Sequence, residues 1–212
     1  MTATWATLRQ SPLMASGGWR LTELLTPAAR TALAEEAVRS HSAAAQVVRL
    51  DRSPDEERER GNPARYMEWA PGGSRLRAFY HAPPLLALLR RLTGLDWTPS
   101  GEQAAFSYYR RPGHHLDVHK DIDACDLAVI TCLHEDGAPA DGLAGALCLW
   151  PGRTGDRLTA IRADPAPGRV PVRLRPGESI VILGGLVPHR LEAMAEGHVR
   201  VVAPLCFRAA TE

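Results

Sequence analysis

The second half of the chain consists of short strand-like runs separated by turn-forming pairs. The runs are rich in β-branched and aromatic residues, and they span Ala105–Arg110, Leu127–Leu133, Ala146–Trp150, Val170–Leu174, Ser179–Leu183 and Val199–Phe207. The turn pairs between them are Pro112-Gly113, Asp136-Gly137, Pro151-Gly152, Pro167-Gly168 and Pro176-Gly177. Several strands at this spacing are typical of an all-β sandwich or barrel. We therefore predict a mainly β fold with a jelly-roll core over residues 104–208.

The segment Leu21–Val48 contains the first predicted helix. Thr26-Pro27 matches an N-cap residue followed by proline at the first helical position. Leu33, Ala37 and Val38 then recur at helical spacing and indicate an apolar face.

A second helix is predicted over Pro83–Leu95, with its leucines on one broad face and Gly94 near its end. The stretch Asp51–Arg60 between the two helices is dense in charge and is predicted to be a solvated loop, with a mobile lid as the alternative. We expect helical support over about residues 1–100 and the β core to form one domain covering residues 1–212.

Charge and cysteine usage restrict the classes of partner and compartment. Lys plus Arg (25) nearly balances Asp plus Glu (24), so nothing indicates nucleic acid as a partner. No apolar run approaches the roughly 20 residues that a membrane-spanning helix needs, and residues 1–18 lack a leader-peptide pattern. Cysteines at positions 125, 132, 148 and 206 form no CxxC pattern and do not resemble a disulfide framework. We expect reduced, buried thiols in a cytoplasmic protein, and no oligomeric state follows from the sequence.

The most informative segment is YYRRPGHHLDVHKDID, at residues 108–123. His119 and Asp121 are two residues apart in it, so in an extended strand both side chains project to the same face. A third ligand has to come from another strand, and His189 follows an apolar run and a glycine-rich turn. Two histidines and a carboxylate on one face leave further coordination positions open, as in the metal sites of non-haem Fe(II) oxygenases. We predict a metal site at these three residues.

The order of the surrounding motifs strengthens this prediction. An isolated His-x-Asp pair is weak evidence, because eight histidines make chance matches common and a single histidine is more often a surface or hydrogen-bonded residue. Here Pro112-Gly113 precedes the pair, and the turn Pro176-Gly177-Glu178 opens the apolar run that His189 follows. Gly197 and Arg200 then stand at the start of another apolar run.

With these motifs, residues 106–207 resemble the 2-oxoglutarate- and Fe(II)-dependent dioxygenases, and most of all their prolyl-4-hydroxylase-like branch. The resemblance implies a double-stranded β-helix in which His119, Asp121 and His189 hold Fe(II). It also implies that Arg200 pairs with the distal carboxylate of 2-oxoglutarate and that Tyr109 helps to bind this cosubstrate. The implied activity is O₂-dependent oxidation, in the first place hydroxylation, of an aliphatic C–H bond in a small molecule or an amino-acid or peptide substrate.

Two positions depart from the family pattern. The family commonly places its arginine ten residues after the distal histidine, whereas Arg200 stands one residue later, which leaves Arg208 as the alternative. The family's tyrosine usually stands three residues before the glycine, whereas Tyr109 stands four before Gly113. Since a shift of one residue changes the face of a strand, the sequence does not separate Tyr108 from Tyr109.

Other polar side chains have plainer interpretations. His134 and His198 stand beside turns and are expected to be solvated. Cys132, on the strand after the His-x-Asp pair, is expected to fill the core. Of the adjacent His114 and His115, at most one can point inward.

Two other functions compete with a dioxygenase. A metal-dependent cupin, either an isomerase or a cosubstrate-independent dioxygenase, usually carries an HxH pair and a following glutamate, and residues 122–126 contain no glutamate. A non-catalytic binding or sensor domain has little reason to keep three ligands and a carboxylate-binding arginine together. Within the dioxygenase interpretation, Asp121 favours hydroxylation or a related desaturation, epoxidation or ring closure, because halogenating relatives replace this carboxylate by a small residue.

Overall fold

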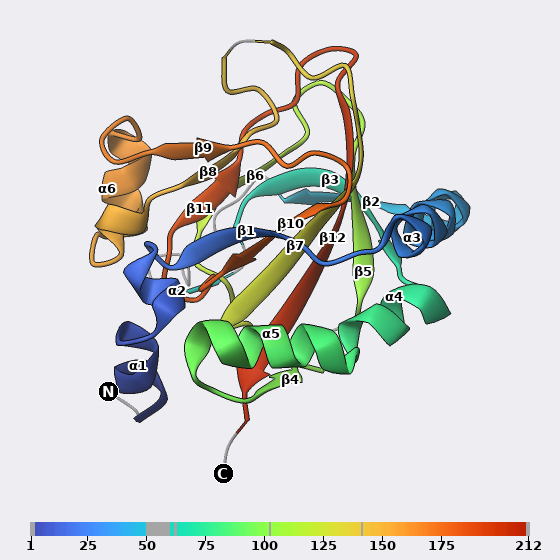
Figure 1. Ribbon diagram of the computed structural model, residues 1–212. Coiled ribbons are helices and arrows are strands. Elements are labelled where there is room, and N and C mark those ends of the chain that lie inside the picture. Colours follow the sequence, from blue (N-terminus) through green and yellow to red (C-terminus); the bar gives the residue numbers. More distant parts are fainter. Residues whose placement is uncertain (1–2, 50–59, 62, 102, 141, 211–212) are drawn as a thin grey trace.

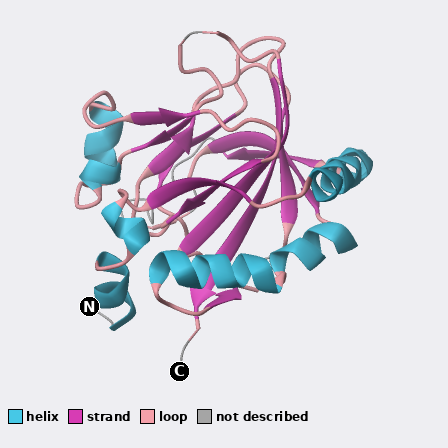
Figure 2. Ribbon diagram, in the orientation of Figure 1, coloured by secondary structure: helices cyan, strands magenta, loops and turns pink. Residues whose placement is uncertain are grey.

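A curled antiparallel sheet dominates the computed structural model, which describes residues 3–49, 60–61, 63–101, 103–140 and 142–210 (Figures 1 and 2). Its strands are β1 Trp19–Glu23, β2 Ala45–Arg49, β3 Arg65–Pro71, β4 Trp97–Pro99, β5 Ala105–Tyr109, β6 His115–His119, β7 Leu127–Asp136, β8 Leu147–Leu149, β9 Val170–Val172, β10 Glu178–Ile182, β11 His189–Leu191 and β12 Val199–Ala209. All six predicted strands are present, so the predicted jelly-roll core is confirmed. Residues 51–59 of the predicted charged loop lie outside the described residues.

The strand order explains how the sheet encloses a cavity. It runs β1-β10-β7-β12-β5-β3-β6-β11-β8-β9, with β2 paired to β3 and β4 paired to β12. One part of β3, Glu68–Pro71, pairs with β5, while Arg65 and Tyr66 at its other end pair with β6. Strand β3 therefore links the two parts of the curled sheet, and β6 and β11 lie beyond this link.

Helices lie around the sheet (Figure 2). They are α1 Ala3–Arg9, α2 Pro12–Ala15, α3 Pro27–Ser40, α4 Ser74–Tyr80, α5 Pro83–Thr93 and α6 Leu158–Ala163, with short 3₁₀ turns η1 His41–Ala43 and η3 Pro151–Arg153. The hydroxyl of Thr26 caps α3 by accepting from the Ala29 N–H at 3.2 Å, and α5 ends at left-handed Gly94 with φ 75°. Both predicted helices are thus confirmed, and no helix in the described ranges is long and apolar enough to cross a membrane.

The N-terminal part of the chain is less purely helical than predicted. Strands β1, β2 and β3 from this part belong to the sheet. The first two pair on one side only and leave Leu21 and Val48 exposed, so their sequences lack the apolar runs that mark a buried strand. The apolar face predicted for α3 is also partly wrong, because Val38 is 75% exposed while Glu36 is buried. The Glu36 carboxylate accepts from three backbone N–H groups at the start of α4, which explains its burial.

Cys125 and Cys206 form a disulfide, so the prediction of four reduced thiols is wrong. Cys132 and Cys148 are free and buried, as expected for core residues. The pair escaped prediction because its members are 81 residues apart and meet only through the fold, with their Cα atoms 4.9 Å apart. Disulfides are rare in reducing compartments. The cytoplasmic location is predicted partly from reduced cysteines, and the disulfide contradicts that argument. The location itself stays a prediction.

Candidate metal centre

Neighbouring strands bring the two predicted histidine ligands together. His119 ends β6 and His189 begins β11, and the two residues are cross-strand partners with ring centroids 4.2 Å apart. Asp121 lies two residues beyond the end of β6, and its Oδ1 is 3.4 Å from Nε2 of His119 and 3.6 Å from Nε2 of His189. One donor atom from each residue lies within 4.8 Å of the others. All three predicted ligands therefore converge on one point.

Backbone carbonyls orient both imidazole rings. Nδ1 of His119 lies 2.8 Å from the carbonyl oxygen of Asp117, and Nδ1 of His189 lies 3.0 Å from that of Val187. A carbonyl oxygen can only accept, so each Nδ1 carries the proton when the ring is neutral. The Nε2 lone pairs are then left to face Asp121. This is the arrangement that supports metal-binding histidines in proteins.

Burial and mutual charge set the protonation of the site. Burial lowers the pKa of His119, and the neighbouring His189 lowers it further. Burial alone would raise the pKa of Asp121, but the imidazoles of His189 and His119 outweigh this effect and keep the pKa well below its usual range. Near neutral pH the site therefore offers an ionised carboxylate and a neutral imidazole at His119. Burial alone would lower the pKa of His189, but the Asp121 carboxylate raises it, and a divalent cation would displace the proton that this imidazole holds.

A glycine makes room for the aspartate. The Asp121 N–H donates to the carbonyl oxygen of Gly184 at 2.8 Å. A Cβ atom at Gly184 would overlap Oδ2 of Asp121, so no larger residue fits at this position without moving the carboxylate. The glycine-rich turn that precedes His189 in the sequence is thus part of the site.

A cavity of about 300 Å³ lies next to these ligands. It is bordered by the five predicted site residues, His119, Asp121, His189, Tyr109 and Arg200. Alternate residues of β5, at positions 105, 107 and 109, face it, as do positions 200, 202 and 204–206 on β12. The remaining walls are mostly apolar, as in small-molecule sites.

Because side chains alternate along a strand, Tyr108 and Tyr109 point to opposite faces of β5. Tyr108 points away from the cavity, and its hydroxyl donates to the carbonyl oxygen of Ala37 on α3 at 2.7 Å. Tyr109 borders the cavity opposite its cross-strand partner Arg200, and burial raises its pKa to about 12. Arg208, the alternative to Arg200, is exposed and pairs with Thr98 on β4. The structure therefore brings together Tyr109 and Arg200 rather than Tyr108 and Arg208.

Arg200 is 1% exposed and has one half of its guanidinium engaged. Nη1 donates to the carbonyl oxygen of Gly145 at 2.8 Å and lies 3.3 Å from Oε2 of Glu135. Nε is buried without a hydrogen-bond partner among the described residues. A buried donor of this kind is costly unless a ligand meets it, so Arg200 is a candidate anion-binding group.

His198 is buried, so the prediction that it is solvated is wrong. Its Nε2 lies 3.0 Å from Oε1 of Glu135, and its ring occupies the space that a Cβ atom at Gly145 would fill. The glutamate that holds it comes from β7, which local sequence does not reveal. His134 is exposed, and Cys132 is buried outside the cavity lining, as predicted for both.

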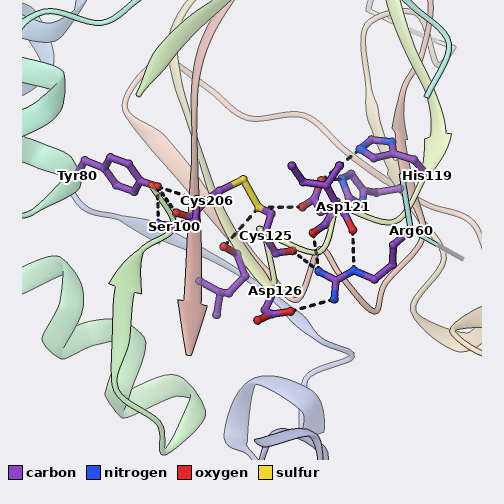
Figure 3. Close-up of a disulfide and its surroundings, with 11 residues drawn as sticks. Arg60, Tyr80, Ser100, His119, Asp121, Cys125, Asp126 and Cys206 are labelled. Atoms are coloured by element: carbon purple, nitrogen blue, oxygen red, sulfur yellow. Dashed lines mark hydrogen bonds and ion pairs between the residues drawn. A yellow bond between two sulfur atoms is a disulfide. The ribbon is translucent and has the colours of Figure 1, made fainter. Parts of the chain in front are cut away.

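Arg60 is the main site residue that the sequence did not indicate. Its side chain is only 19% exposed, contrary to the prediction for the charged stretch Asp51–Arg60. Its Nε donates to the carbonyl oxygen of Asp121 at 2.8 Å (Figure 3). The Cys125–Cys206 disulfide also borders the cavity, and Sγ of Cys125 lies 3.6 Å from Oδ2 of Asp121. The charge pattern alone could not distinguish Arg60 from its neighbours, because its partners are distant in sequence.

The structure thus combines a jelly-roll sheet with two histidines and an aspartate that face its cavity, a donor set that suits a single metal ion. The sequence matches no family model and no curated protein. Among solved structures it is similar to a prolyl-4-hydroxylase of Pseudomonas putida, with 21% identity over 98% of this chain and 100% of that one and a TM-score of 0.60.

Two further structures are similar. The α-ketoglutarate-dependent epimerase SnoN from nogalamycin biosynthesis has 18% identity over 97% of this chain and 82% of that one, with a TM-score of 0.69. A prolyl hydroxylase from Trichoplax adhaerens has 14% identity over 97% and 90%, with a TM-score of 0.64. The chain therefore has the fold of the 2-oxoglutarate and Fe(II) oxygenases, including the prolyl-4-hydroxylase-like branch.

Proposed function

We propose that this protein is a non-haem Fe(II) and 2-oxoglutarate-dependent dioxygenase. It oxidises an aliphatic C–H bond of a small molecule or an amino-acid or peptide substrate, with release of succinate and CO₂. The observation that carries this proposal is the convergence of His119, Asp121 and His189 beside a cavity that also holds the buried Arg200. A binding module without catalysis would not need the ligand triad and the arginine in one cavity.

The donor set fits Fe(II). His119, His189 and Asp121 would hold the ion with two imidazole nitrogens and one carboxylate oxygen, the donor set of non-haem Fe(II) sites that keep positions open for cosubstrate and O₂. Asp121 supplies the anion, and the carbonyls of Asp117 and Val187 keep the two Nε2 atoms aimed at it. The presence of a carboxylate at position 121 favours hydroxylation, or a related desaturation, epoxidation or ring closure, over halogenation.

The part of the cavity at Arg200 fits a carboxylate of 2-oxoglutarate. A guanidinium presents paired N–H groups to a carboxylate and remains charged at every physiological pH. Glu135 and Gly145 engage Nη1 of Arg200, whereas its Nε has no partner among the described residues. Tyr109, the cross-strand partner of Arg200, also borders the cavity, and its neutral hydroxyl lies 3.7 Å from Sδ of Met67, a weak acceptor that a bound carboxylate would replace.

The protein's own residues bind and orient the cosubstrate, and they exclude water from the cavity. When bound, Fe(II) and 2-oxoglutarate supply the activation of O₂ and the oxidising equivalents. Arg200 and Tyr109 hold the cosubstrate's distal end, while Ile130, Leu191 and Val202 keep the cavity wall apolar. Structures with this fold include one in complex with a peptide fragment and one in complex with nogalamycin RO, so both proposed substrate classes occur on it.

Succinate formation tests the proposal. The purified protein, given Fe(II), O₂ and 2-oxoglutarate, is expected to form succinate slowly without a primary substrate, and Asp121→Ala is expected to lower this rate at least a hundredfold. Full activity in Asp121→Ala would show that the ligand assignment is wrong. Metal binding without any Fe(II)-dependent binding of 2-oxoglutarate would favour the metal-dependent cupin, and binding of neither would favour the sensor domain.

A further inference from the structure

The guanidinium of Arg60 lies in a socket formed by the loop that follows β6 (Figure 3). Nε donates to the carbonyl oxygen of Asp121 at 2.8 Å, and Nη2 donates to those of Ile122 at 2.7 Å and Cys125 at 2.9 Å. Nη1 donates to Oδ1 of Asp126 at 3.0 Å. One side chain from a distant part of the sequence therefore fixes both ends of the segment 121–126.

These contacts hold the main chain of Asp121 and leave its carboxylate for other partners. The Asp121 N–H donates to Gly184 and its carbonyl oxygen accepts from Arg60, so both of its backbone polar groups are engaged. The positive charge of Arg60 is balanced by Asp126 at 3.0 Å and by Asp123, 92% exposed, at 3.5 Å. The guanidinium thus orders the loop without adding uncompensated positive charge at the metal site.

The Gly184-Gly185 pair accommodates both side chains. A Cβ atom at Gly184 would overlap the carboxylate of Asp121, and one at Gly185 would lie 2.5 Å from Nη2 of Arg60. The N–H of Gly185 also approaches the carbonyl oxygen of Asp126 at 3.3 Å. Two adjacent glycines therefore form a surface on which the ligand and the guanidinium lie side by side. A side chain at Gly184 would collide with Asp121, and one at Gly185 would collide with Arg60.

We propose that Arg60 is a positioning residue for the metal site. It holds the segment 121–126 so that the Asp121 carboxylate meets the Nε2 atoms of His119 and His189. The inference rests on the proposed function, because it needs a metal at these three residues. The Cys125–Cys206 disulfide anchors the same segment to β12, so Arg60 and the disulfide secure it from two sides.

Metal affinity measured without turnover tests the inference. Metal-free protein is titrated with Mn²⁺, and free Mn²⁺ is followed by electron paramagnetic resonance. Arg60→Lys is expected to weaken binding about 10- to 100-fold, the range found when groups that orient metal ligands are lost. Lysine keeps the charge but presents its donors from a single nitrogen, so it cannot reach three carbonyls and a carboxylate together.

Arg153→Lys is the matched control. The Arg153 side chain is 16% exposed, and it likewise bonds one carboxylate, that of Asp156, and one backbone carbonyl, that of Asp164. Neither partner belongs to the segment 121–126. This variant is expected to bind Mn²⁺ as the unaltered protein does, which separates the positioning effect from a general loss of buried arginine contacts.

Gly185→Ala provides a second route that leaves Arg60 in place. The added Cβ displaces the guanidinium, and a three- to tenfold loss of Mn²⁺ affinity is expected, with altered visible absorption bands when Co²⁺ is bound. Each protein is first shown by circular dichroism to be folded at the titration temperature. Unchanged affinity in folded Arg60→Lys and Gly185→Ala would overturn the inference. Absence of Mn²⁺ binding in the unaltered protein would instead overturn the metal site and the proposed function.

Discussion

Arg200 is buried, and the residues that the structure describes bind one side of its guanidinium. Glu135 and Gly145 take up Nη1, and His198 in turn fixes Glu135, so the guanidinium is held on one side by the protein itself. A buried charge of this kind requires a partner in the folded protein. The Nε, which has no hydrogen-bond partner within the described part of the chain, then remains for a ligand, as the proposed binding of a dicarboxylate requires.

Substitution of each of the two adjacent tyrosines tests which one faces the cavity. Tyr109→Phe is expected to raise the KM for 2-oxoglutarate about fivefold without a large change in kcat, since one hydrogen bond is worth about 1 kcal/mol. Tyr108→Phe removes the bond to Ala37 and is expected to lower the free energy of unfolding by about 1 kcal/mol while KM is unchanged. Steady-state succinate assays and urea unfolding measure the two effects. A higher KM in Tyr108→Phe alone would contradict the orientation of β5.

The disulfide joins two elements of the fold, the loop after β6 and strand β12. Its two cysteines are 81 residues apart, so the cross-link restricts a long stretch of the unfolded chain. Cys125→Ser with Cys206→Ser is expected to lower the free energy of unfolding by about 2–4 kcal/mol. Thermal melting with and without a dithiol reductant measures this, and the reductant should lower Tm in the unaltered protein only. An equal effect of reductant on both proteins would contradict the cross-link.

Strands with a continuous apolar run could be predicted from the sequence, whereas strands without one could not, whether they lie at an edge like β1 and β2 or inside the sheet like β3. The six predicted strands carry apolar runs, and α3 and α5 are marked by Thr26 and Gly94. Strands β1 and β2 pair on one side only and read as polar segments. The convergence of His119, Asp121 and His189 could be predicted because these residues and their neighbouring motifs follow one another in the sequence at recognisable intervals. Arg60 and Glu135 could not, because their partners come from distant elements.

At the scale of the whole molecule, the curled sheet buries several groups that must remain protonated. Burial raises the pKa of Tyr108 and Tyr109 to about 12, and it raises the pKa of Cys132 and Cys148 to about 12 as well. All four lie on strands, between the sheet and its helices or inside the curl. These groups ionise at lower pH in the unfolded chain than in the folded protein. The free energy of unfolding therefore decreases as the pH rises under alkaline conditions.

The sign of this linkage gives a prediction for the complete chain. Each group has a higher pKa when folded than when unfolded, so its contribution to stability is complete below about pH 9 for cysteine and pH 10 for tyrosine and is lost as the pH rises towards 12. The free energy of unfolding is expected to fall by up to about 8 kcal/mol between pH 8 and pH 11, with the two cysteines contributing more than the two tyrosines. Urea unfolding at pH 8, 9, 10 and 11 measures this, in the variant without the disulfide so that thiolate exchange cannot interfere. Adding Cys132→Ala and Cys148→Ala should remove the early part of the fall and leave the tyrosine part above pH 10, whereas a flat profile would contradict the burial of these four groups.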